Sequence, residues 1–222
     1  MSKLVIFDVD GTLIDSQAHI IASMTAAFDA EGRAVPERNA ILSIVGLSLP
    51  YAIRELAPDA SEDAIIRMVN AYKDDFNANR LKLDAAVPLF AGAEDAIVRL
   101  AARDDVQLAI ATGKSRRGLD ALLAQWSFAG HFGSTQCADD HPSKPHPSMV
   151  FSCLADCDVL AQDAVVVGDT TYDMEMAHAA RCAAIGVSWG YHGVAALKDT
   201  GARAVIDDFE ALESALDEIW KD

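Results

Sequence analysis

Short apolar runs alternate with segments of helical periodicity along most of this chain. Runs of strand length, which predict buried strands, occupy residues 4–7, 106–111, 164–167, 183–187 and 204–206, with a less apolar candidate at 133–137. Apolar positions at helical spacing fall between them, at residues 92–102, 118–125, 148–156, 174–180 and 210–220. Because strands and helices alternate, the pattern predicts an α/β fold with a doubly wound parallel sheet.

Residues 16–83 interrupt this alternation, because they carry helix signals only. Apolar side chains recur there at spacings of three or four residues, at Ile20, Met24 and Phe28 and then at Ile65, Val69, Tyr72 and Phe76. A strand-free stretch of this length directly after the first strand predicts an inserted helical module. We therefore expect a core of residues 1–15 and 87–222 and an inserted domain of residues 16–86, with hinges near residues 14–16 and 85–88.

The first strand ends in two carboxylates at i, i+2. Asp8 and Asp10 would share one side of an extended chain, and Gly11 allows a sharp turn directly after them. The pair would then lie at the carboxyl end of a buried strand, where open α/β sheets place their ligand sites. The alternative is that the acids only start a turn, because Asp-Gly is a common turn dipeptide.

The strand at residues 106–111 runs into Thr112 and Gly113, with a helix beginning just beyond. A hydroxyl, a free backbone amide and a helix N-terminus together form an anion site. The alternative is an ordinary helix N-cap at Thr112 or Ser115. The cations Lys114, Arg116 and Arg117 follow, and they either solvate the helix start or steer an anion towards it.

Two further strand ends carry chemistry of the same kind. Lys144 lies in a proline-rich loop before a helix, where it either neutralises a phosphate or is a solvated surface lysine. The strand at residues 164–167 ends in Gly168 and Asp169, with Asp173 one helical turn further on. Carboxylate oxygens of Asp8 and Asp169, with the Asp10 carbonyl, suit magnesium. Asp173 would either support these magnesium ligands or hold Lys144.

Composition narrows the choice of partners and compartment. The formal net charge of −16 argues against nucleic acid, whose binding needs many Lys and Arg contacts to phosphate. No apolar run approaches the roughly 20 residues of a membrane span, and the first apolar run is too short for a signal peptide. We therefore expect a cytoplasmic protein with no membrane partner. Its four cysteines are expected to be reduced and mostly buried.

Together these strand ends resemble the four motifs of the haloacid dehalogenase superfamily. The motifs are Asp8-Val9-Asp10-Gly11-Thr12, Thr112-Gly113, Lys144-Pro145, and Gly168-Asp169 with Asp173, in that order along nearly the whole chain. The resemblance implies a Rossmann-like core, and the helical insertion looks like that family's small cap. The loop at residues 143–147 and the segment 168–174 look most like the phosphoglycolate phosphatase-like branch.

The resemblance also implies roles for individual residues. Asp8 would be the nucleophile that forms an aspartyl-phosphate, and Asp10 the general acid and base. Lys144 would offset the charge of the phosphate, which Thr112 and the Gly113 amide would also bind. Magnesium would be held at four positions, namely Asp8, Asp10, Asp169 and Asp173.

The predicted function is a magnesium-dependent phosphatase acting on a small phosphorylated metabolite, with phosphoglycolate as one candidate. A sugar phosphomutase of the same fold and a non-catalytic module that binds phosphate and magnesium are the alternatives. Substrate choice is expected to lie in the cap, where Ser48 in the loop 46–50 and the following Arg54 are the candidates. The alternative is a helix connection with a surface arginine. Monomer and homodimer are both open.

Overall fold

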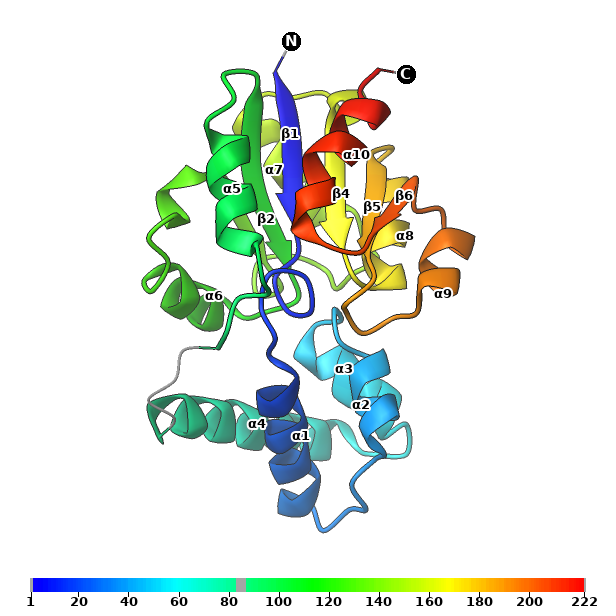
Figure 1. The fold of residues 1–222 in the computed structure, drawn as a ribbon. Helices are drawn as coiled ribbons and strands as arrows, with labels where there is room; N and C mark the ends of the chain where they lie inside the picture. Colours follow the sequence, from blue (N-terminus) through cyan, green and yellow to red (C-terminus); the bar gives the residue numbers. More distant parts are fainter. Residues whose placement is uncertain (1, 83–86, 222) are drawn as a thin grey trace.

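A parallel six-stranded sheet forms the centre of the larger part of the molecule in this computed structural model, which describes residues 2–82 and 87–221 (Figure 1). The strand order is β3-β2-β1-β4-β5-β6. The strands are β1 (Lys3–Phe7), β2 (Val106–Thr112), β3 (Phe132–Cys137), β4 (Ala164–Gly168), β5 (Ala183–Val187) and β6 (Ala204–Ile206). All pairings are parallel, which confirms the predicted sheet.

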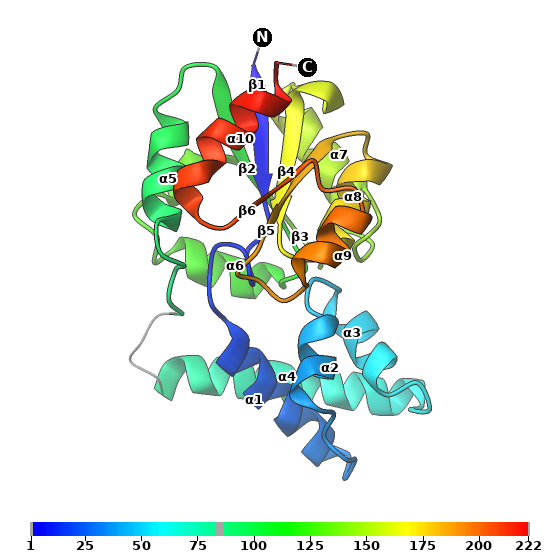
Figure 2. The same cartoon turned by 45° about the vertical axis from the view of Figure 1, so that its right-hand side comes forward.

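Helices cover both faces of this sheet (Figures 1 and 2). One face carries α5 (Ala93–Ala101) and α10 (Leu212–Ile219), with α6 (Arg116–Leu123) near the edge; the other carries α7 (Ser148–Cys157), α8 (Thr171–Ala179) and α9 (Val194–Asp199). Alternate residues of β1 serve the two faces, since Val5 packs towards α5 and Ile6 towards α7. Short 3-10 turns lie at Ala129–His131, Ala161–Asp163 and Phe209–Ala211.

Four helices form a separate layer at the carboxyl ends of the strands (Figures 1 and 2). They are α1 (Gln17–Ala30), α2 (Arg38–Ser43), α3 (Leu49–Leu56) and α4 (Glu62–Lys82), and the described residues 16–82 include no strand. This layer, called the cap below, has its own apolar core, in which Ile20, Met24, Phe28 and Ile65 are buried as their spacing predicts. Phe76 instead lines a cavity between the cap and the sheet.

Two neighbouring linkers join the cap to the sheet. The Asp15 amide donates to the Pro88 carbonyl at 2.9 Å, and the Phe90 amide donates to the Leu13 carbonyl at 2.9 Å. The expected hinge at residues 14–16 coincides with the first linker. Residues 85 and 86, where the second hinge and the domain border were expected, lie outside the described residues, so the division at 86/87 stays a prediction.

The ends of several elements differ from the prediction because capping groups set them. Ser115, rather than Thr112, caps α6, which begins two residues earlier than predicted, since its hydroxyl accepts from the Gly118 amide at 3.2 Å. A reciprocal capping box between Thr170 and Asp173 starts α8 at Thr171, three residues early. The short helix α9 was missed, because its single buried side chain, Leu197, gives no periodicity.

Two predictions from composition can be compared with the structure. All four cysteines are buried and free, which confirms the expectation of reduced, buried thiols. Burial raises the pKa of the Cys153 thiol to about 12, so this side chain behaves as a small apolar group of the core. Among the described residues, none of the helices has the length and apolar character that crossing a bilayer requires.

Candidate active site

The site residues predicted in the core meet at the carboxyl edge of the sheet. β1 and β4 are neighbours there, and the chain winds outwards in opposite directions from this pair, which makes it the topological switch point where α/β sheets bind ligands. A cavity of about 940 Å³ lies between this edge and the cap. From the core it is lined by Asp8, Asp10, Thr112, Gly113, Lys114, Ser115, Arg117, Gly118, Ala138, Asp139, His141, Pro142 and Ser143.

Asp8, Lys144 and Asp173 form a buried charge cluster at the floor of the site. The Lys144 ammonium lies 2.9 Å from Asp8 Oδ1 and donates to Asp173 Oδ1 at 2.7 Å, and the side chains are 0–2 % exposed. Asp173 Oδ2 accepts from both the amide and the hydroxyl of Thr170. Lys144 is therefore not a surface lysine; Asp173 holds it against Asp8, which is one of the two roles considered for that acid.

Burial and neighbouring charge shift the pKa values of this cluster. Desolvation raises the pKa of Asp8 to about 6, against the opposing pull of Lys144 and with added repulsion from Asp173. Burial alone would lower the pKa of Lys144, but the carboxylates of Asp173 and Asp8 outweigh it and hold the pKa above its ordinary value. The lysine is thus a fixed positive charge beside a carboxylate that is costly to ionise.

Asp169 joins the cluster from the end of β4. Thr12 donates its hydroxyl to Asp169 Oδ1 at 2.9 Å, and the Tyr191 amide donates to Oδ2 at 2.9 Å. Burial, together with the charges of Asp173 and Asp8, raises the pKa of Asp169 well above its ordinary value. The turn that brings Thr12 here depends on Gly11, whose φ is +87°.

The donor set fits a hard divalent cation. Carboxylate oxygens of Asp8, Asp169 and Asp173 all lie within 4.8 Å of one another. Neither oxygen of Asp8 accepts a well-aligned hydrogen bond from the described residues, although both are buried. Four carboxylates, including that of Asp10, face two ammonium groups, those of Lys144 and Lys114, so two negative charges are uncompensated. Oxygen ligands with this charge balance are what Mg²⁺ prefers.

Asp10 is bound by a lysine that follows the second motif. Lys114 donates to Asp10 Oδ1 and Oδ2, each at 2.8 Å, so this lysine neither solvates the helix start nor stands free for an incoming anion. Its amide donates to the Thr112 hydroxyl at 3.2 Å. Thr112 and Gly113 line the cavity next to these groups, where the phosphate-binding role was expected.

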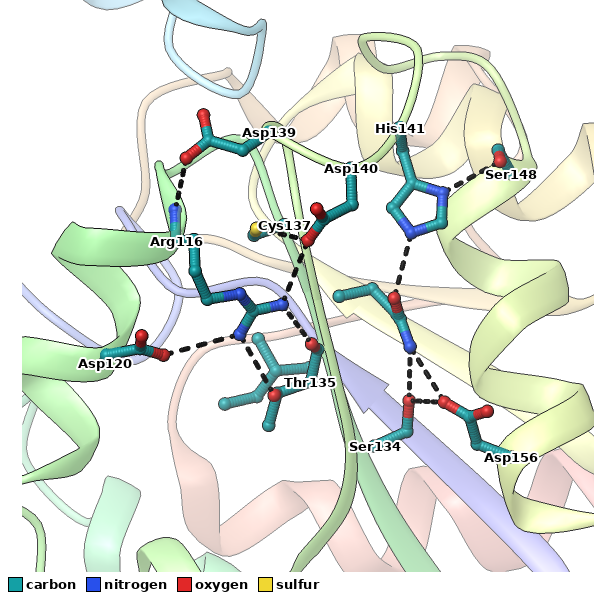
Figure 3. Close-up of polar contacts among 12 residues, drawn as sticks. Arg116, Asp120, Ser134, Thr135, Cys137, Asp139, Asp140, His141, Ser148 and Asp156 are labelled. Carbon is teal, nitrogen blue, oxygen red and sulfur yellow. Dashed lines mark hydrogen bonds and ion pairs between the residues drawn. The ribbon is translucent and has the colours of Figure 1, made fainter.

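A polar network secures the loop that carries Lys144 (Figure 3). Arg116 donates to the Thr135 carbonyl at 2.7 Å and lies 3.4 Å from Asp140 Oδ2, so it anchors the loop after β3 and does not steer an anion. On the other side of the same loop, His141 bonds the Ser148 hydroxyl through Nδ1 at 2.8 Å. The loop is thereby tied to β3, α6 and α7 before it reaches the site.

The cap approaches the core closely through the loop between α2 and α3. The Ser48 amide donates to the Ser143 hydroxyl at 2.8 Å, and Ser48 lines the cavity. The hydroxyl of Tyr172 donates to the Ser43 carbonyl at 3.2 Å, and His192 Nε2 lies 3.1 Å from the same oxygen. A Cβ on Gly113 would lie 2.5 Å from the Gly46 carbonyl oxygen. The structure therefore shows a closed cap.

Arg54 is the predicted cap residue that the site does not include. Its guanidinium pairs with Glu62 at 2.6 Å on the outside of the cap, with side chains 44 % and 74 % exposed, and it is not part of the cavity wall. The geometry favours the alternative for this position, a surface arginine beside a helix connection. The ring of His146, two residues after Lys144, accepts from the Ser148 amide at 3.2 Å and is not part of the cavity wall.

Most of this chain is similar in sequence to known proteins. Residues 5–187 match the family model described as haloacid dehalogenase-like hydrolase. The chain belongs to this hydrolase family. The "Probable phosphatase IndB" of Dickeya dadantii is 32% identical over 224 residues, covering 100% of this chain and 96% of that protein.

Further proteins are similar to this chain in sequence or in fold. The phosphoglycolate phosphatase of Pectobacterium atrosepticum is 25% identical over 205 residues, covering 91% of this chain and 87% of that protein. A predicted phosphatase from Clostridium acetobutylicum has the same fold, with a TM-score of 0.86 at 23% identity over 98% of this chain and 99% of that one. The chain is a phosphatase-type hydrolase of this family, and it is similar over most of its length to phosphoglycolate phosphatases.

Three contacts of the site were not predicted. Thr12 was quoted as part of the first motif but given no role, although a hydroxyl directly after two acids is a usable signal for a carboxylate partner. The Lys114 contact to Asp10 had a partial signal, a cation placed against a helix dipole. The Tyr191 amide had none, because a backbone donor to Asp169 depends only on the path of a loop.

Proposed function

We propose that this protein is a magnesium-dependent phosphatase that hydrolyses a small-molecule phosphate monoester through an aspartyl-phosphate on Asp8. The observation that carries the proposal is the buried pair of Asp8 and Lys144 at the switch point of the sheet, 2.9 Å apart, with Asp8 lining the cavity. A carboxylate held beside a fixed cation at this position suits nucleophilic attack on an anionic phosphate.

In the first half-reaction, an Asp8 oxygen forms a bond to phosphorus as the bond from phosphorus to the alcohol oxygen breaks. Asp10, protonated at this stage, gives its proton to the departing alkoxide, which leaves as the alcohol. Lys144 offsets the repulsion between the carboxylate and the phosphate, and Thr112 with the Gly113 amide binds the phosphoryl oxygens. Closure of the cap excludes bulk water from this step.

In the second half-reaction, Asp10 is a carboxylate and takes a proton from a water molecule as the water oxygen bonds to phosphorus. The bond between phosphorus and Asp8 breaks, which releases phosphate and restores the Asp8 carboxylate. One residue thus serves both steps.

Mg²⁺ would be held by the carboxylates of Asp8 and Asp169 and the Asp10 carbonyl, with Asp173 beside them. When bound, it supplies positive charge that lowers the repulsion between the nucleophile and the phosphate. The uncompensated negative charge of the site and the raised pKa of Asp169 support this assignment.

The substrate belongs to the small phosphorylated metabolites, with 2-phosphoglycolate as the first candidate. A cavity of about 940 Å³ is at the upper end of the sizes typical for small-molecule sites, so it also admits sugar phosphates and nucleotides. Tyr51, Tyr72 and Phe76 line its cap side and would contact the organic part. Ser48, at the cap loop, is the remaining candidate for substrate selection.

Phosphate release from a panel of these compounds, with Mg²⁺ or EDTA, tests the proposal. Magnesium-dependent release that is lost in Asp8→Asn supports it, and the preferred compound identifies the substrate class. Conversion of a sugar phosphate into its isomer without free phosphate would identify a mutase. Binding of phosphate and Mg²⁺ without any turnover would identify a non-catalytic module, and either result would refute the phosphatase.

A further inference from the structure

Asp10 has a single side-chain partner in the described part of the chain. Both of its carboxylate oxygens accept from Lys114, each at 2.8 Å, and the side chains of the pair are only 9 % and 13 % exposed. An ion pair that is largely removed from water and makes two hydrogen bonds fixes the carboxylate more firmly than a surface pair does. Without Lys114, no described group would hold the Asp10 carboxylate in one orientation.

Lys114 is itself held from two sides. Its aliphatic stem packs over α6 at Gly118, where a Cβ would lie only 3.0 Å from Lys114 Cγ. Its ammonium lies 5.1 Å from the centroid of the Phe76 ring, within the range of a cation–π contact. Phe76 belongs to α4 of the cap, whereas Asp10 and Gly118 belong to the core. The Phe76 contact therefore exists only while the cap is closed.

We infer that Lys114 is a positioning residue that holds the Asp10 carboxylate in its working orientation, and that Phe76 completes this arrangement when the cap closes. The inference rests on the proposed function, because it concerns the proton transfers assigned to Asp10. General acid catalysis needs the acid within hydrogen-bond reach of the leaving oxygen, and it contributes about 10²–10⁴-fold when that geometry is met. When Asp10 acts as the acid, one of its oxygens carries the proton and the other accepts from Lys114, so Lys114 still orients the group while the cap is closed.

The dependence of kcat/KM on the leaving group distinguishes a residue that positions Asp10 from one that binds substrate or stabilises the fold. An alkyl phosphate loses a strongly basic alkoxide, which needs the proton of Asp10 in the first half-reaction. 4-Nitrophenyl phosphate loses a phenolate that is stable without protonation. The value of kcat/KM covers the reaction up to departure of the leaving group, so a misplaced acid lowers it for the alkyl ester and hardly for the aryl ester.

The experiment measures kcat and KM of the full chain with Mg²⁺ for both kinds of ester. We expect Lys114→Met to lower kcat/KM for the alkyl ester about 10²-fold and for the aryl ester less than about 3-fold. Lys114→Arg is expected to restore part of the loss, because a guanidinium can also bind both carboxylate oxygens. Phe76→Leu is expected to show the same selective loss at smaller size. Lys198→Met, an exposed lysine on α9, is the matched control.

Three results would overturn the inference. An equal loss of kcat/KM for both esters in Lys114→Met would indicate a general structural role for Lys114. A higher KM with unchanged kcat would indicate that Lys114 binds substrate and does not position Asp10. An unselective effect of Phe76→Leu would refute the link to cap closure. Failure of the proposed function is distinguishable from all three, because the wild-type protein would then release no phosphate from either ester.

Discussion

The two walls of the active-site cavity are built in different ways. On the core side, Asp8, Lys144 and Asp173 are almost fully buried charged groups joined by contacts of 2.7–2.9 Å, and of these Asp8 lines the cavity itself. The cap wall presents aromatic and partly exposed side chains such as Tyr51 and Phe76, with few polar contacts to the core. A dry, charged wall suits chemistry on a phosphate, which every substrate shares. An aromatic, adaptable wall suits selection among the organic parts, which differ.

The largest effect is expected when a charged side chain of the core wall is replaced by a neutral one. Asp8→Asn is expected to reduce kcat/KM by at least about 10³-fold, because the proposed nucleophile is lost. The same change should raise the Tm of metal-free protein at pH 8 by about 5 °C, since it removes a buried carboxylate whose pKa is raised to about 6. Thermal unfolding with EDTA, beside a phosphate-release assay, measures both effects. Asp207→Asn, at an exposed position, is the control. A lower Tm would show that the Asp8 charge stabilises the fold.

A second prediction separates the walls physically. Gly113→Ala places a Cβ 2.5 Å from the Gly46 carbonyl oxygen, so the cap cannot close fully. We expect kcat/KM to fall about 10²-fold, in line with the cost of small displacements of catalytic groups. Gly130→Ala is the matched control, because a Cβ there meets nothing within 4 Å. Wild-type kinetics in Gly113→Ala would show that close contact of cap and core is not needed.

The third prediction concerns pH and metal. The folded-state pKa values of Asp169 and Asp8 lie above the unfolded value of 3.8, so the folded state binds protons more tightly than the unfolded state. The stability of the metal-free protein therefore falls as the pH rises from about 3.8 to about 6 for Asp8, and over a range that extends well above 3.8 for Asp169. Mg²⁺ offsets the buried charge, so it should raise Tm by about 5–10 °C at pH 8 when present at 100 times its Kd, and by much less at pH 5. KCl of equal ionic strength controls for screening. An equal rise at both pH values would place the cation elsewhere.

The smallest expected effect lies outside both walls. Arg54→Ala removes an exposed pair with Glu62 that does not line the cavity, so KM should change less than about 2-fold and stability by less than about 1 kcal/mol. Steady-state kinetics with the preferred substrate gives the answer. A KM raised 10-fold or more would show that Arg54 reaches the substrate, as its charge alone had suggested.

The same contrast explains what could be predicted from the sequence. The apolar runs of a parallel sheet show where its strands end, and parallel strands end at the same edge of the sheet. The sequence alone therefore predicted that Asp8, Thr112 and Asp169 lie close together. The cap offers no such rule. Helical spacing found its core at Ile20 and Met24, but it could not tell that Phe76 faces the cavity while Arg54 lies outside.

Contacts that depend on loop paths were also beyond the sequence. Lys114 is separated from Asp10 by 104 residues, and its position follows from how α6 starts at its Ser115 cap. Arg116, two residues later, instead contacts Asp139 and Asp140 in the loop that leads to Lys144. Neighbouring cations with the same sequence signal thus have different roles, and only the backbone geometry distinguishes them.

Covalent catalysis by Asp8 can be tested by trapping the phosphoenzyme. The protein is mixed with a ³²P-labelled substrate and Mg²⁺, quenched in acid and digested, and the labelled peptide is sequenced by mass spectrometry. We expect one acid-stable, hydroxylamine-sensitive label on Asp8, absent from Asp8→Asn. Steady turnover with no label on the protein, or a label on another residue, would contradict it.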